Sequence, residues 1–199
     1  MADWTIGTGS YLQHGRSRSG AGAAAVRYFQ ESTAASTAVI KIGDVVVRDT
    51  VVTTGGFRIS RGASSGGNSA NLLLIGQTIV GIAAEGSTSD GSTSGLVDTS
   101  SGAAGRVINK KIGVYVAESD CEFLGYLSAG ASRSSNNGDN FAVRYDSTNH
   151  VYMVDSTNST AALVTVKQTG IPEGTEGDTN GPIYFKFLSS NVYLGSVTV

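Results

Sequence analysis

The amino-acid sequence predicts an all-β protein: an antiparallel β-barrel or β-sandwich, with room for two small β subdomains and an extended N-terminal arm. Its apolar runs, such as Val45-Val46-Val47 and Ile79-Val80-Gly81-Ile82-Ala83, are short, mostly β-branched and bounded by Gly, Asp or Ser. No segment keeps apolar residues at helical spacing over the dozen or so positions that a stable helix requires. The chain of 199 residues is long enough for one large or two small β domains.

The first 26 residues predict an extended N-terminal arm. Residues 1–22 are rich in Gly and Ser and show no strand periodicity. Through residue 30 the only acidic side chain is Asp3, whereas Arg16, Arg18 and Arg27 are basic. We therefore expect this arm to be poorly ordered until a partner holds it.

Residues 27–117 predict a β-barrel-like domain. Short apolar runs indicate closely spaced strands at residues 37–42, 45–48, 51–54, 57–61, 72–75, 77–85 and 106–117. Gly43-Asp44 and Gly55-Gly56 are two-residue hairpin signals, because Gly accepts positive φ angles without a steric clash. Residues 86–105 are a long Ser/Thr/Gly loop of a length usually found in functional or mobile segments.

Residues 118–199 predict a β-meander or β-sandwich packed on the first domain. Strands are expected at residues 121–127, 140–145, 150–154, 161–168, 183–188 and 192–199. The motif Asp-Ser-Thr-Asn occurs at residues 146–149 and again at 155–158, and such side chains cap turns by bonding back to the backbone. Residues 189–191 are expected to turn a final hairpin that builds the C-terminus into a sheet.

The composition argues against several classes of partner. Only 15% of the residues are charged and the net charge is −2, so no electrostatic attraction to nucleic acid or anionic lipid is expected. No apolar stretch suits a signal peptide or a membrane span, and we expect the protein to be made and used without crossing a membrane by that route. Cys121 is the only cysteine, and we expect it to be a small buried hydrophobic residue.

No catalytic residue is expected. A Ser-His-Asp triad would need one of the only two histidines, His14 or His150, and neither accompanies a Gly-x-Ser-x-Gly nucleophile motif. Two groups of carboxylates could gather oxygen ligands, but neither follows the spacing of a known calcium loop. Solvated faces or partner contacts explain them better, and no metal or cofactor is expected. The groups are Glu118, Asp120 and Glu122, and Glu173, Glu176 and Asp178.

The order of these motifs resembles the small β-barrel decoration, or cement, proteins that coat the heads of tailed phages. The resemblance lies in Lys41-Ile42-Gly43-Asp44-Val45-Val46, followed by short hairpins, and in Ile79-Val80-Gly81-Ile82-Ala83-Ala84-Glu85 before the segment 87–91. In the second half, residues 141–155 and 181–188 are similar to proteins of cyanobacterial phages. The likeness covers residues 27–199.

The resemblance implies a structural virion protein rather than an enzyme. Such a protein binds the outer surface of the phage head and stabilises contacts between major capsid proteins. It would be made in the host cytoplasm, located on the capsid surface, and assembled as a homo-oligomer, either a dimer or a trimer. The arm offers candidate capsid-binding residues: the aromatic Trp4 and Tyr11 and the basic Arg16 and Arg18.

Two alternatives remain open at the level of sequence. The chain could be a phage tail or fibre adhesin domain that binds a receptor or glycan, which would be present in few copies per particle. A hydrolase on a β scaffold is the third class, although no set of nucleophile, base and orienting residue is visible.

Overall fold

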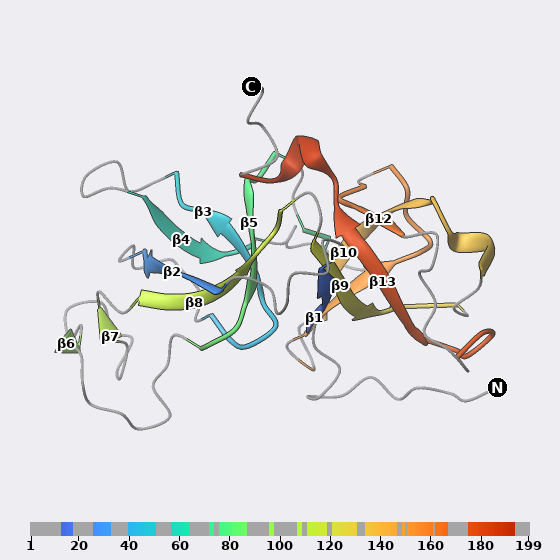
Figure 1. Ribbon diagram of the computed structural model, residues 1–199, viewed down its shortest axis with the longest axis horizontal. Coiled ribbons are helices and arrows are strands. Elements are labelled where there is room, and N and C mark those ends of the chain that lie inside the picture. The colour runs from blue at the N-terminus through green and yellow to red at the C-terminus, as the bar shows by residue number, and fades with distance from the viewer. Residues whose placement is uncertain are drawn as a thin grey trace.

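The fold is all-β, as the sequence predicts, and consists of a closed barrel beside a curved six-stranded sheet (Figure 1). The computed structural model describes residues 13–17, 26–32, 40–50, 57–63, 72–73, 76–86, 96–97, 107–108, 111–118, 121–130, 134–146, 149, 151–160, 162–166 and 175–193. Within these residues the helical segments are two short 3-10 turns, η1 (Ser134–Asn136) and η2 (Ser189–Asn191).

Five strands close the barrel in the order β2-β4-β3-β5-β8. They are β2 (Val26–Glu31), β3 (Val45–Arg48), β4 (Arg58–Arg61), β5 (Ile79–Ala83) and β8 (Lys111–Val116). Neighbouring strands run antiparallel except β2 and β4, which are parallel. The barrel interior is filled by Ile40, Val46, Ile59, Val80, Ala83, Ile112 and Val114.

Strands β3 and β5 are buried on both faces, which explains their uninterrupted apolar sequences. Val46 and Val80 point into the barrel, whereas Val45, Val47 and Ile79 point outward into a second hydrophobic cluster. The two strands shift register between Val46 and Val47. At this shift Gly81 lies so close to β8 that an added Cβ would collide with the backbone carbonyl oxygen of Tyr115.

The six-stranded sheet has the order β1-β9-β13-β12-β10-β11. Its strands are β1 (Gln13–Ser17), β9 (Cys121–Tyr126), β10 (Asn140–Asp146), β11 (Val151–Asp155), β12 (Val164–Val166) and β13 (Pro182–Phe187). Each neighbouring pair is antiparallel. The sheet curves back on itself, because the Ser128 amide, just after β9, donates to the carbonyl of Val154 in β11.

Strand β1 corrects one expectation for the N-terminal arm. Its residues pair with β9, with Arg16 opposite Glu122 and Ser17 opposite Cys121. Residues 13–17 therefore belong to a sheet, although their polar sequence gives no strand periodicity. The backbone register of this pairing with β9 is a long-range feature that the composition of the arm does not reveal.

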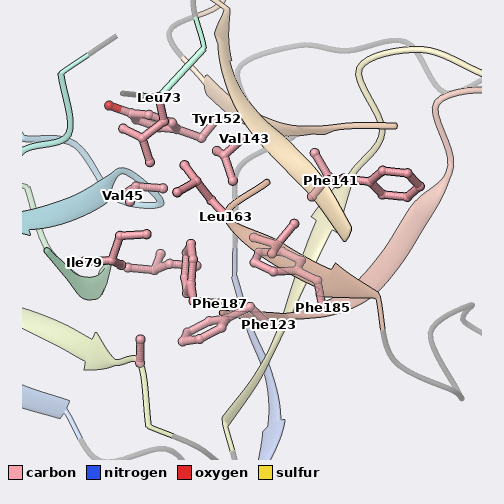
Figure 2. Close-up of a cluster of buried hydrophobic side chains, with 14 of the residues drawn as sticks. Val45, Leu73, Ile79, Phe123, Phe141, Val143, Tyr152, Leu163, Phe185 and Phe187 are labelled. Atoms are coloured by element: carbon pink, nitrogen blue, oxygen red, sulfur yellow. The ribbon is translucent and has the colours of Figure 1, made fainter. Parts of the chain in front are cut away.

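A single hydrophobic cluster joins the barrel to the sheet (Figure 2). Val45, Leu73 and Ile79 from the barrel side face Leu163 and Phe187 from the sheet. Phe123, Phe185 and Phe187 contact one another with ring centroids 5.4–5.9 Å apart. Backbone hydrogen bonds also link the two parts: Leu73 N, in the segment between β4 and β5 that bridges β10 at Leu72, donates to Val143 O, and Tyr193 N donates to Ile79 O of β5, both at 2.8 Å.

Of the described strands between residues 26 and 116, five form the barrel and β6 (Leu96–Val97) and β7 (Val107–Ile108) pair with each other, whereas those from residue 121 onward lie in the six-stranded sheet. The division of the chain into an arm at 1–26 and domains at 27–117 and 118–199 stays a prediction.

Two local expectations are wrong. Within the predicted loop 86–105, Leu96–Val97 forms strand β6, which pairs with β7 (Val107–Ile108). The predicted final hairpin also fails at Val192, which follows η2 and bridges Ile79 of the barrel instead of folding back on β13. Burial of Val192 in the shared cluster explains why this apolar residue crosses to the barrel. The strands predicted at residues 51–54 and 194–199 lie outside the described residues.

Candidate functional site

A buried polar cluster lies where the barrel meets the sheet. Two members come from the barrel: Asp44 precedes β3 and Arg61 ends β4. Val46 lies opposite Arg61 across the strand pair, and Asp44 is two residues before Val46. Because side chains alternate along a strand, Asp44 and Arg61 belong to the same side of the barrel wall.

Asp44 is almost completely buried, with 2% of its surface exposed. Its Oδ2 accepts a hydrogen bond of 2.8 Å from the backbone N–H of Lys41. Burial raises the pKa of Asp44 from 3.8 to about 7, although the Lys41 hydrogen bond and the positive charges of Arg61 and Lys41 oppose the rise. The carboxyl group can therefore gain or lose a proton near neutral pH.

The sheet contributes two tyrosines to this cluster. Tyr145 in β10 lies opposite Tyr152 in β11, and their ring centroids are 4.9 Å apart. Arg61 Nη1 donates a hydrogen bond of 3.1 Å to the Tyr145 hydroxyl, and its Cζ lies 4.6 Å from the centre of the Tyr145 ring. The Tyr152 hydroxyl donates to the carbonyl oxygen of Gly62 at 2.7 Å. Two tyrosines of the sheet thus bind consecutive residues of the barrel.

Burial raises the pKa values of both tyrosines above 10, so both stay protonated near neutral pH. The Nε atom of Arg61 is buried without a hydrogen-bond partner. The cluster therefore combines a carboxyl group that titrates near pH 7 with a guanidinium group that has one N–H still to satisfy.

Large hydrophobic side chains are exposed on or beside the barrel. Tyr28 on β2 is 59% exposed and Ile42, in the turn before β3, is 55% exposed. Val26 and Tyr193 are exposed to a lesser degree. The Tyr28 hydroxyl donates to Glu85 Oε1 at 3.3 Å, which holds one edge of the ring in place. Exposed apolar side chains are candidates for contact with another macromolecule where they form a continuous patch, and Val26 and Tyr28 lie two residues apart on β2.

A partly exposed aromatic group lies near the same barrel. The ring of Phe57 is 5.5 Å from that of Phe29 and 4.6 Å from that of Tyr193, measured between centroids. The Arg48 guanidinium carbon is 5.8 Å from the centre of the Phe57 ring. Phe29 and Phe57 pack against the barrel core, whereas Arg48 and Tyr193 are exposed.

Three of the four predicted capsid-binding residues, Trp4, Tyr11 and Arg18, lie outside the described residues. Arg16 is placed in β1 opposite Glu122 by its backbone. The assignment of these four residues to a capsid contact stays a prediction.

The carboxylate group around residue 120 does not form one solvated face. Glu118 forms an ion pair with Arg27 at 3.1 Å, whereas Glu122 is 1% exposed within β9. Of the two expectations, a solvated face or a partner contact, the first is therefore wrong for Glu122, which is buried although it alternates along β9 with the core residues Cys121 and Phe123. Among the described residues, no three His, Cys, Asp or Glu side chains form a group able to hold a metal ion.

The other sequence candidates have simple positions. Cys121 is buried, as expected. The backbone of His14 lies in β1. His150, Asp120 and Glu173 lie outside the described residues. Asp178 is buried and Glu176 is partly exposed.

Both Asp-Ser-Thr-Asn turns are capped by their aspartates, as the repeat predicted. Asp146 accepts from Asn149 at 3.2 Å through the backbone and at 2.8 Å through the side chain. Asp155 Oδ1 accepts a hydrogen bond of 3.0 Å from the backbone N–H of Thr157 and a second one of 2.6 Å from the Thr157 hydroxyl. The repeat therefore serves the turns on either side of β11.

Sequence reasoning missed the role of Asp44. Gly43-Asp44 suggested a two-residue hairpin turn, but the turn is formed by Ile42 and Gly43, with Gly43 at φ 83°. The missed signal was the alternation Asp44, Val46, which places the carboxyl group on the same side as a core valine. Tyr145 and Tyr152 flank the first turn motif, and their pairing could be derived once that turn was located.

Comparison of the chain with protein-family models, curated proteins and solved structures finds no match. Within the described residues, no helix is long and apolar enough to cross a membrane.

Proposed function

We propose that the chain is a non-enzymatic structural protein of a virus particle, a decoration protein that binds the outer surface of a tailed-phage head. In this proposal it stabilises contacts between major capsid proteins and needs no cofactor. The observation that carries the proposal is the presence of exposed hydrophobic side chains, above all Tyr28 and Ile42, on a densely packed β body. Its second support is the resemblance of residues 41–46 and 79–91 to small β-barrel decoration proteins.

The exposed side chains suit many weak contacts better than one strong contact. Complete burial of a large hydrophobic side chain contributes about 1.5–3 kcal/mol, so a few such residues give modest affinity. A dimer or trimer of the chain, placed at each repeat of a symmetric shell, would gain strength through simultaneous binding. The partner in this proposal is the major capsid protein, with no nucleic acid or membrane involved.

The shared core suits a bracing role. Because Val45 and Ile79 of the barrel pack with Leu163 and Phe187 of the sheet, a load applied to one part is transmitted to the other through close-packed side chains. Anything that binds the assembled shell but not its dissociated parts stabilises the shell by mass action. The protein would be made in the host cytoplasm and act on the capsid surface.

The first test is the copy number of the protein per virion, measured by quantitative mass spectrometry on the phage that encodes it. Hundreds of copies are expected for decoration, whereas a dozen or fewer would contradict it and favour a tail component. A second test uses the double variant Tyr28→Ser, Ile42→Ser, which should bind isolated heads at least tenfold more weakly. The matched control is Tyr184→Ser on β13, which should keep full binding if both variants retain the wild-type melting temperature.

A second candidate function is a tail or fibre adhesin that binds a glycan. It is favoured by the adjacent rings of Phe57 and Tyr193 and by the guanidinium of Arg48 beside the Phe57 ring. Aromatic faces stack on sugar rings, and a neighbouring guanidinium can donate to hydroxyl groups. The variant Tyr193→Ala should abolish binding to host-surface glycans if this function is correct. Absence of any glycan binding by the wild-type protein would eliminate it.

A further inference from the structure

The contacts that hold the sheet to the barrel depend on Arg61 and on the residue next to it. Arg61 reaches the Tyr145 hydroxyl at 3.1 Å, and Gly62 accepts from Tyr152 at 2.7 Å. The guanidinium group that makes the first contact shares one side of the barrel wall with the buried carboxyl group of Asp44. A change of charge on Asp44 therefore acts, through its electrostatic interaction with Arg61, on a contact between the two parts of the molecule.

We propose that the junction between the barrel and the six-stranded sheet is a pH-sensitive lock, in which ionisation of Asp44 draws Arg61 away from Tyr145 and loosens the sheet from the barrel. This regulation concerns the fold itself and does not depend on the proposed capsid role.

The geometry provides the attraction that this change requires. Asp44 already accepts one hydrogen bond from the Lys41 backbone, but an ionised carboxylate accepts several. Arg61 has a buried Nε–H without a partner, so the guanidinium gains a charge-assisted hydrogen bond by turning toward an ionised Asp44. With Asp44 neutral, this gain disappears and the contact with Tyr145 is favoured.

Among the described residues, the charged and titratable groups that act on Asp44 and the two tyrosines are Arg61, Lys41 and Asp146. The positive charges of Arg61 and Lys41 lower the pKa of Asp44. Tyr145 and Tyr152 stay neutral, because burial raises their pKa values. The negative charge of Asp146 raises the pKa of Tyr145 further. Asp44 is thus the group of the cluster that changes charge near neutral pH.

The direction of the pH effect follows from the two states of Asp44. Its pKa is about 7 in the folded protein, against 3.8 as the ordinary value. The folded state therefore holds the proton more tightly than the unfolded state. The added stability is fully present below about pH 4 and is lost as the pH rises through 7. Over this window the unfolding equilibrium constant should rise by up to about tenfold per pH unit.

The first experiment compares urea unfolding at pH 5 to 8 for the wild type and the variants Asp44→Asn and Asp49→Asn. Asp49 is the matched control, because it is also buried and lies at the opposite end of β3. We expect the steep pH dependence to disappear in Asp44→Asn and to persist in Asp49→Asn. An unchanged pH dependence in Asp44→Asn would overturn the proposal.

The second experiment separates a loosened junction from a general loss of stability by measuring amide hydrogen exchange. The Leu73 amide donates to Val143 across the junction, whereas the Ser32 amide donates to Ile59 within the barrel. After correction for intrinsic exchange, protection of Leu73 should fall at least tenfold more than that of Ser32 between pH 5.5 and 8. Equal changes at both amides would show that no local lock exists.

A third variant keeps the test decisive if Asp44→Asn fails to fold. Tyr145→Phe removes the hydroxyl that Arg61 contacts but leaves Asp44 to titrate. Its unfolding should keep a pH dependence, while the extra loss of Leu73 protection at pH 8 should vanish. A Leu73 response equal to that of the wild type would overturn the role of the Arg61–Tyr145 contact.

Discussion

Replacing Tyr152 by Phe removes one oxygen atom from the boundary between barrel and sheet and should measurably destabilise the protein. Tyr152 is 1% exposed, and its hydroxyl makes a hydrogen bond of 2.7 Å to the carbonyl oxygen of Gly62. The aromatic ring stays in place in the variant, so the hydrophobic burial is retained and the carbonyl loses its donor. A buried polar group left unsatisfied costs about 1–3 kcal/mol.

For a chain of this length, 1 kcal/mol lowers the melting temperature by about 2–4 °C. A loss of about 2 kcal/mol therefore predicts a decrease of about 4–8 °C, measured by differential scanning calorimetry. The control is Tyr28→Phe, which removes an exposed hydroxyl that bonds Glu85 at 3.3 Å and should change stability by less than about 0.5 kcal/mol. Equal melting temperatures for the two variants would refute the reasoning, since burial of the bond would then carry no energetic weight.

The barrel and the sheet should unfold together in one cooperative transition, because one hydrophobic cluster runs through both; two separate calorimetric peaks would contradict this. Gly81→Ala should prevent accumulation of folded protein, because the new Cβ would collide with the Tyr115 carbonyl, whereas Gly113→Ala meets side-chain atoms first and should fold. Deletion of residues 1–25 removes β1 from β9 and should lower solubility and stability, while deletion of residues 1–12 retains β1 and should be tolerated. Virions that lack the protein should release DNA at a lower temperature than complete virions, and equal release temperatures would count against the decoration role.

The fold class could be predicted from the sequence because the physical cause is local. Val45 to Val47 and Ile79 to Ala83 have the composition of strands buried on both faces, and the capping aspartates of the two repeated turns act within a few residues. Strand β1 and the course of Val192 could not be predicted in the same way. Both depend on backbone pairing with distant strands, which leaves little trace in the local pattern.

The candidate site shows the same division between local and distant causes. The sequence offers Asp44 as a good turn residue, and only the closed barrel shows that its carboxyl group is buried beside Arg61. The contacts to Tyr145 and Tyr152 join residues 84 and 90 positions apart in the sequence. No rule based on spacing within one element identifies such a cluster.

The placement of β1 also bears on how the chain folds during synthesis. Of the described strands, β1 is synthesised before the others, but its partner β9 follows about 100 residues later, after all five strands of the barrel. At about 5–20 residues per second, β9 is complete only about 0.5–2 s after the last barrel strand, because ten residues separate Val116 at the end of β8 from Tyr126 at the end of β9. Strand β1 therefore stays without its sheet partner until all five barrel strands have been synthesised, and pairing over such a sequence distance is slow.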